Sequence, residues 1–569
     1  MLDLKPAVRK FLSSNIDLDD WGLLEPYFDA LEKRELNSVK ELELWMRDRS
    51  ELESALAEEL GWRYIHVSRD TGSEEATAAY KKMIGEILPK VAPLEHALNL
   101  KLTQSPYFEK LDKETYRIYL RSIKSQIELF HEENIPLNTE LAELAQEYGS
   151  ITGQMSVDWK GEQLTLQQAG VMLRENDRSL REEIYRKIQN ERGSKSSELN
   201  DLFDRLIAKR QEVAKNAGFD NYRDFKFKDL GRFDYSVDDC VDFHASIASA
   251  IVPIVKSFDD ERIEKLGVDT LRPWDNQVDP GGRSPLKVFD GSAQDLLDKA
   301  VRVFNAADPF FADCLLTMDQ MGHLDLESRK GKAPGGYNYP LYETGVPFIF
   351  MNAAGVLRDF VTLIHEGGHA VHSFVTRDFD MKEFQRTPSE VAELASMSME
   401  LISMEHWDLL FDDESETKRA KKEHLEKVLE VLPWIATIDA FQHWIYTNEH
   451  SQEERRAAWE SIRARQSTGS VDWTGLEEIK AVQWQSQLHL FEVPFYYIEY
   501  GMAQLGAIAI WRRYKIDPQG ALADYKAALE LGYTKTIGEI YERAGIRFDF
   551  SPSYVQELAD FVYQEWKKL

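Results

Sequence analysis

Residues 365–369 read His365-Glu366-Gly367-Gly368-His369, and this HExxH string carries more information than any other part of the chain. On a helix, positions i and i+4 lie one above the other, so both imidazoles can reach one metal ion. Zinc suits this pair, because it accepts histidine nitrogens and, in catalytic sites, keeps one position for water. Glu366 lies between them and can accept a proton from the metal-bound water. The string therefore predicts a zinc-binding helix with its own general base.

The flanking residues indicate that this helix is buried. Residues 360–364 and 370–375 are apolar on nearly every side, as in the core helix of a large protein, and Asn352 is the expected N-cap. The adjacent glycines Gly367 and Gly368 each cost about 1 kcal/mol of helix stability relative to alanine. We therefore expect another group to approach the helix backbone closely at this point.

A catalytic zinc ion needs a third protein ligand. The metzincin pattern would place glycine and histidine where this chain has His372 and Val375, which excludes that class. The alternative is a glutamate from the next helix, predicted over residues 388–404. Carboxylates on such an apolar, methionine-rich helix are costly unless they are paired or bind a metal. Spacing alone leaves three candidates open: Glu390, Glu393 and Glu400.

Two segments resemble a known family. Residues 362–372 and 391–400 are similar to the oligoendopeptidase F branch of the M3 zinc metallopeptidases, to which thimet oligopeptidase and neurolysin are more distantly related. The resemblance implies that Glu393 is the third zinc ligand and that Glu400 supports a ligand histidine from the outer shell. Gly367 departs from the family, which more often carries phenylalanine or leucine there, and we expect a wider space beside the metal.

A third group of candidates lies near the C-terminus, in a segment rich in tyrosine. Phenol and imidazole donors can stabilise the oxyanion that forms when a peptide carbonyl is attacked, and Tyr497 and Tyr500 are one helical turn apart. The residues alone favour an aromatic core. The family resemblance instead matches His489, Tyr497 and Tyr500 to its catalytic segment, with Tyr496 as an alternative to Tyr497.

A glycine- and proline-rich segment, residues 331–352, precedes the HExxH helix. Within it, residues 346–351 predict a short strand, and we expect its exposed edge to pair with an extended peptide through backbone hydrogen bonds. This interpretation resembles the substrate strand of the family. The other interpretation is a hairpin that only closes a lobe. The predicted strand residues are Val346, Phe348, Ile349 and Phe350.

Composition narrows the class of protein. A chain of 569 residues that is 43% hydrophobic and contains 13 tryptophans is expected to form two or more lobes. A formal charge of −30 argues against nucleic acid as a partner. We find no signal peptide and no run of 18 apolar residues, so we predict a cytoplasmic protein without a membrane span. Cys240 and Cys314 are interpreted as buried thiols. Nothing in the sequence specifies the oligomeric state.

The hydrophobic pattern is mostly helical. A lone hairpin is predicted over residues 155–165, with Lys160 and Gly161 at its turn, and a long loop over 271–285. We divide the chain into an N-terminal helical region, 1–195, and a catalytic zinc peptidase domain, 196–569. By resemblance, the fold is zincin-like and mainly α, with two lobes, a deep central channel and a small β-sheet beside the active-site helix. Long helices are predicted over residues 107–134, 137–156, 165–192 and 194–217.

Together these observations predict a zinc-dependent endopeptidase that hydrolyses internal bonds of short, unstructured oligopeptides. Two alternatives remain open. One is a carboxypeptidase of the same architecture, which would need a buried anchor for the substrate carboxylate. The other is an inactive peptide-binding protein that has kept its zinc ligands. Sequential loss of C-terminal residues would indicate the first, and zinc content without turnover would indicate the second.

Overall fold

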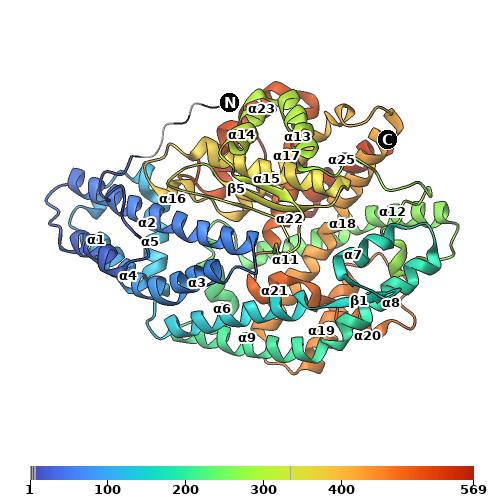
Figure 1. Cartoon of the computed structure of the whole chain (residues 1–569), viewed down its shortest axis with the longest axis horizontal. Helices are drawn as coiled ribbons and strands as arrows, with labels where there is room; N and C mark the ends of the chain where they lie inside the picture. The colour runs from blue at the N-terminus through green and yellow to red at the C-terminus, as the bar shows by residue number, and fades with distance from the viewer. Residues whose placement is uncertain (1, 3, 5–7, 334) are drawn as a thin grey trace. The chain divides into compact units, whose positions relative to one another are not determined.

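The computed structural model describes residues 2, 4, 8–333 and 335–569, and helices account for 69% of the structure. Two small sheets complete the fold (Figure 1). The mainly α fold class is confirmed. The helices predicted over 107–134, 137–156 and 194–217 each have a counterpart at a similar position, although α6 (Asn134–Gly153) begins earlier than expected and contains Pro136 in its first turn. Proline is tolerated there because an N–H in the first turn has no partner within the helix. The single helix predicted over 165–192 is wrong, because the chain breaks at residues 175–177, where Asp177 caps the start of a new helix, Arg178–Ser194.

The chain divides into two compact units, each made of three separate segments. The first unit comprises residues 1–132, 287–420 and 503–548, and the second comprises 133–286, 421–502 and 549–569. Residues 195 and 196 both belong to the second unit, where one helix ends at Ser194 and the next begins at Ser196. The division of the chain into regions 1–195 and 196–569 therefore stays a prediction from the sequence. The deep central channel also stays a prediction.

The first unit begins with a helical layer around an apolar core. Trp45, Phe28 and Leu102 are among the fully buried side chains of this core. The helices α1, α2 and α5 begin where Asp20, Ser38 and Asp112 accept hydrogen bonds from backbone N–H groups of the first turn. The bounds are α1 Trp21–Lys33, α2 Val39–Arg69, α3 Glu74–Lys82, η1 Met83–Ile87, α4 Leu88–Gln104, η2 Phe108–Lys110 and α5 Lys113–Leu129.

The second layer of this unit surrounds the HExxH helix, α15. Figure 1 shows α15 beside the strand β5 and the helix α17. The bounds are α13 Ala293–Ala307, α14 Pro309–Gln320, β3 Leu324–Glu327, β4 Tyr337–Tyr339, β5 Phe348–Ala353, α15 Leu357–Thr376, α16 Lys382–Gln385, α17 Ser389–Met404, η6 Trp407–Leu409, α23 Pro518–Leu529 and α24 Ile537–Arg543. The helices α18, Glu414–Thr447, and α22, Ile498–Ile516, contribute residues to both units.

The three-stranded sheet corrects one prediction. Its order is β3-β5-β4, with β3 parallel and β4 antiparallel to β5. Ile349 pairs with Leu324 on one side and with Asn338 on the other, so β5 is the central strand. Phe348, Ile349 and Phe350 are fully buried, and Val346 lies before the strand begins. The exposed edge predicted for residues 346–351 is therefore wrong, because neighbouring strands already use both of its edges. The small sheet beside the HExxH helix is confirmed.

The start of α15 also differs from expectation. The helix begins at Leu357, and Asp359 accepts hydrogen bonds from the backbone N–H groups of Ala354, Gly355 and Val356 at 2.8, 2.8 and 3.0 Å. A carboxylate is favourable there because it faces the positive end of the helix dipole. Asn352 is not the N-cap. Its side-chain amide instead donates to the backbone carbonyls of Ala333 and Gly335, in the loop between β3 and β4.

The second unit is helical apart from one hairpin. The predicted hairpin is confirmed, because β1 pairs with β2 in antiparallel register, and Lys160 and Gly161 adopt positive φ values of 54° and 89° at its turn. The bounds are β1 Ser156–Trp159, β2 Glu162–Thr165, α7 Leu166–Val171, η3 Met172–Arg174, α8 Arg178–Ser194, α9 Ser196–Asn216, α10 Tyr222–Asp229, α11 Val237–Ser246, η4 Ile247–Ile251, α12 Val252–Leu266, η5 Pro273–Asp275, α19 Gln452–Arg465, α20 Glu477–Ala481, η7 Gln483–Ser486, α21 Leu488–Glu492 and α25 Pro552–Lys567.

One continuous helix of this unit, Val237–Leu266, meets the length and hydropathy criteria for a membrane span, because 18 consecutive residues of it have a mean hydropathy of 1.2. Core helices pass the same test. This helix comprises α11, η4 and α12, and Phe243, Ile247 and Ile251 on it are fully buried. It packs against α25 inside the second unit, so its apolar face contributes to the core.

Candidate metal centre

The structure brings His365, His369 and Glu393 together. Nε2 of His365 lies 3.3 Å from Oε2 of Glu393, and Nε2 of His369 lies 3.7 Å from the same oxygen. The three ligand atoms are within 4.8 Å of one another. Two ligands bound to one zinc ion in tetrahedral geometry are about 3.3 Å apart. Two imidazoles and one carboxylate therefore fit a zinc ion, with one position left for water.

Glycine at position 368 permits this arrangement. A Cβ atom at Gly368 would lie 2.6 Å from Cα of Ser396 and 2.9 Å from the carbonyl oxygen of Ala395, both on α17. The helix backbones thus approach closely where α15 carries the histidines and α17 carries Glu393. This is the close approach that the two glycines predicted.

Gly367 has a different neighbour. A Cβ atom there would lie 2.7 Å from the ring of Phe304, which belongs to α13. The expectation of a wider space beside the metal is wrong, because the Phe304 ring occupies the volume that a larger residue at 367 would fill.

We expect Gly368→Ala to destabilise the protein. In a helix, alanine is more favourable than glycine by about 1 kcal/mol. At position 368, however, its methyl group would press on the backbone of α17, which cannot move without separating the two helices. Such overpacking costs about 1–3 kcal/mol. Thermal unfolding should show a lower Tm and metal titration a weaker affinity. Gly149→Ala is the matched control, since nothing lies within 4 Å of its added Cβ in α6. A Gly368→Ala protein as stable as the wild type would contradict the tight helix contact.

Further hydrogen bonds fix the three side chains. Nδ1 of His365 lies 2.6 Å from Oε1 of Glu400, about two helical turns further along α17 than Glu393. Such a contact orients the ring so that Nε2 faces the metal. Oγ of Ser396 donates to Oε2 of Glu393 at 3.2 Å. Glu390 is also buried, but among the described residues it is not part of this donor group. Geometry therefore separates the three glutamates that spacing left open.

Glu366 lies between the histidines on α15, and only 7% of it is exposed. Burial raises the pKa of its carboxyl group to about 7, against the lowering influence of His365. Burial also lowers the pKa of His369 to about 4, which favours the neutral imidazole that binds metals. Asn338 of β4 donates its side-chain amide to the backbone carbonyl of Glu366 at 3.1 Å. Sequence reasoning missed Asn338, although it lies in the segment singled out before the HExxH helix.

His489, Tyr497 and Tyr500 gather in an aromatic cluster within the second unit. The ring centroid of His489 is 4.7 Å from that of Tyr497 and 5.8 Å from that of Tyr500. Tyr496 joins the same cluster, 6.1 Å from His489 and 5.4 Å from Tyr500. The amide of Gln487 lies 2.7 Å from Nδ1 of His489 and sets the orientation of its ring.

A buried arginine holds the tyrosine-rich segment in place. Arg232 donates to the backbone carbonyl of Phe495 and, at 2.8 Å, to Oε1 of Glu499. Phe495 has a φ of +67°, a strained value for a bulky residue that persists only when its surroundings enforce it. Sequence reasoning missed both Arg232 and Glu499. The position of Glu499 inside an otherwise aromatic run could have indicated a buried charge with a partner.

Two histidines one helical turn apart, a glutamate between them and a third ligand, a carboxylate from a neighbouring helix, define the metallopeptidase class. The chain belongs to peptidase family M3. The family matches residues 171–279 and 298–560, and the M3 N-terminal domain matches residues 14–130. The resemblance noted in the sequence is therefore confirmed.

Individual relatives match over shorter stretches. Chromosomal oligoendopeptidase F of Lactococcus lactis subsp. cremoris is 36% identical over 96 residues, which are 17% of this chain and 15% of that protein. Oligopeptidase PepF of Bacillus subtilis is 30% identical over 130 residues, which are 23% of this chain and 19% of that protein. The aligned segments thus span less than a quarter of either relative.

The similarity in fold extends over the whole chain. The solved structure of PZ peptidase A with an inhibitor superimposes with a TM-score of 0.91 at 24% sequence identity. The superposition covers 98% of this chain and 99% of that one. The two proteins therefore share their fold.

Proposed function

We propose that this protein is a zinc-dependent endopeptidase that hydrolyses internal bonds of short, unstructured oligopeptides. The observation that carries the proposal is the group of metal-binding side chains formed by His365, His369 and Glu393. Glu366 lies on the same helix, between the two histidines. The family and the oligopeptidase names of its relatives support the same class of substrate.

In this proposal His365, His369 and Glu393 hold the zinc ion, and Glu400 orients His365. When bound, zinc supplies Lewis-acid chemistry, which polarises the scissile carbonyl and acidifies water. The carboxylate of Glu366 accepts the proton of the attacking water and passes it to the leaving nitrogen. Its buried position supports this role, because a carboxyl group with a pKa near neutrality can both accept and release a proton.

We keep His489, Tyr497 and Tyr500 as proposed donors to the oxyanion, with Tyr496 as the alternative to Tyr497. The family resemblance is the basis for these roles. The rigid support of their segment by Arg232 agrees with them, because oxyanion donors act best when they are already oriented.

For substrate binding we propose the strand β4 in place of β5. In the described sheet β4 is paired only with β5, so its other edge is the one that an extended peptide can pair with. The contact from Asn338 to the Glu366 carbonyl places this strand beside the catalytic helix. Backbone pairing makes few demands on side chains, so we expect broad sequence preference.

Digestion of a peptide in two contexts tests the proposal. We expect internal cleavage of a flexible peptide that is blocked at both ends, and no cleavage of the same sequence inside a stable folded domain. Glu366 and Glu393 are 7% and 3% exposed, so a folded substrate would have to unfold to reach them, at a cost of several kcal/mol. Mass spectrometry of the products gives the answer.

Each alternative has its own outcome in this assay. Single residues lost in turn from the C-terminus of an unblocked peptide would indicate the carboxypeptidase. A protein that contains zinc but produces no fragments would indicate the inactive binding protein. Equal rates on the folded domain and the free peptide would contradict the buried site.

A further inference from the structure

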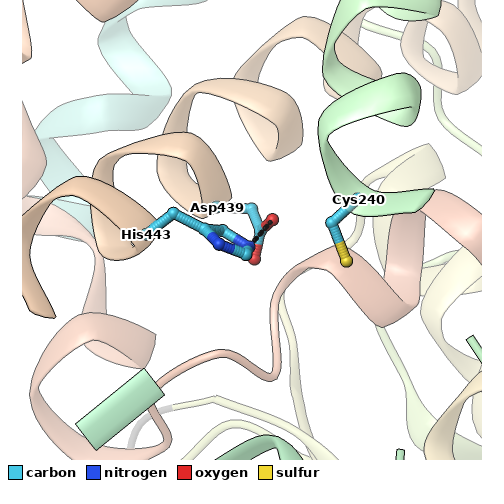
Figure 2. A group of neighbouring side chains, drawn as sticks. All are labelled: Cys240, Asp439 and His443. Carbon is cyan, nitrogen blue, oxygen red and sulfur yellow. Dashed lines mark ion pairs between the residues drawn. The ribbon is translucent and has the colours of Figure 1, made fainter. Parts of the chain in front are cut away.

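A second group of metal-binding side chains lies inside the second unit, outside the HExxH centre. Figure 2 shows Asp439 and His443 one turn apart on α18, with the thiol of Cys240 on α11 beside them. Cys240 and Asp439 are fully buried, and His443 is 8% exposed. The three ligand atoms are all within 4.8 Å of one another.

The polar atoms of this group are incompletely satisfied. Oδ1 of Asp439 accepts no hydrogen bond from the described residues, and neither ring nitrogen of His443 has a hydrogen bond of good geometry with them. Buried polar atoms without partners are rare and cost free energy. A bound cation would satisfy these atoms.

We propose that Cys240, Asp439 and His443 bind a zinc-type divalent cation. A thiolate, an imidazole and a carboxylate are the three ligand types that zinc takes from proteins. Nε2 of His443 lies 3.1 Å from Oδ2 of Asp439, close to the separation of about 3.3 Å expected for two such ligands on one tetrahedral ion. Binding displaces the thiol proton to solvent, and the two anionic ligands then balance the charge of the cation.

His244 completes the site as a supporting residue. Its Nε2 lies 2.8 Å from Oδ2 of Asp439, so it orients the carboxylate in the manner of an outer-shell partner. It comes from α11, the helix that carries Cys240, while Asp439 and His443 come from α18. The ion would tie these two helices together. Since the group is buried, the role is structural and not catalytic.

Cobalt substitution tests the proposal on the full-length protein. After chelation of bound metal and reloading with Co²⁺, we expect two cobalt ions per chain and a near-ultraviolet charge-transfer band from thiolate to cobalt. The HExxH centre has only nitrogen and oxygen donors, so the band reports on the second site alone. Cys240→Ser should lose the band and one cobalt ion, and should keep peptide hydrolysis. Cys314→Ser is the matched control, because it removes the other buried thiol, in the first unit.

A second measurement covers the case in which Cys240→Ser fails to fold. In Glu393→Ala, which removes a ligand of the HExxH centre, Co²⁺ should still produce the thiolate band and Zn²⁺ should still raise the Tm. Wild-type protein that binds one cobalt ion per chain without the band would overturn the proposal. The buried group would then be an ion cluster of His244, Asp439 and His443 alone. Neither result depends on whether the protein cleaves peptides.

Discussion

Glu366→Gln is expected to abolish nearly all peptide hydrolysis and to leave the metal content unchanged. The side chain is not among the three donors, so glutamine removes the proton acceptor without removing a ligand. Loss of a general base lowers kcat by about 10²–10⁴-fold. Because the base acts in the transition state, kcat and kcat/KM should fall together. Kinetic measurements would give the loss of kcat and kcat/KM, and elemental analysis of the same sample would give the metal content.

The control for this variant is Glu390→Gln, which changes another buried carboxyl group on the neighbouring helix outside the donor group. It should retain most of the activity. Loss of a general base should leave about a hundredth of normal turnover or less. If Glu366→Gln kept more than about a tenth, the assignment of Glu366 as the general base would be wrong.

Glu393→Ala is expected to eliminate tight metal binding at the HExxH centre. It removes the only anionic donor of the three and leaves two imidazoles, whose Nε2 atoms both face Oε2 of Glu393. Competition with a chromogenic chelator would measure the affinity. The experiment is best made in a Cys240→Ser background, so that the second proposed site does not add to the metal count.

Two neighbouring glutamates make this prediction specific. Glu400→Ala should weaken binding by about 10–100-fold, as expected for a residue that orients a ligand. Glu390→Ala should leave the affinity unchanged. A metal-free Glu390→Ala protein beside a metal-loaded Glu393→Ala protein would show that the wrong carboxylate had been chosen.

Local patterns predicted much of the fold. The apolar periodicity indicated helices near those observed in the second unit, and the Lys160-Gly161 pair indicated the hairpin, because turn chemistry depends on a few adjacent residues. The same kind of reasoning failed at Asn352. The sequence does not show which of two polar residues accepts hydrogen bonds from the backbone N–H groups at the start of α15. In the structure Asp359, inside the first turn, accepts them.

The HExxH string by itself determined that two imidazoles and a carboxyl group share one region of a helix, since the helical repeat places i and i+4 together in any context. It also indicated, through two adjacent glycines, that another group must approach the helix backbone closely. Family resemblance then pointed to Glu393, where spacing had left three glutamates equivalent.

Only the tertiary structure decided which groups meet across the chain. The contact at Gly368 brings Glu393 and not Glu390 to the histidines. The pairing of β5 on both sides depends on β3 and β4, and no property of residues 346–351 reveals it. Cys240 likewise meets Asp439 and His443 only because α11 packs against α18. The physical reason is common to all three cases. Periodicity along one element sets its faces, whereas the partner of each face depends on packing between elements far apart in sequence.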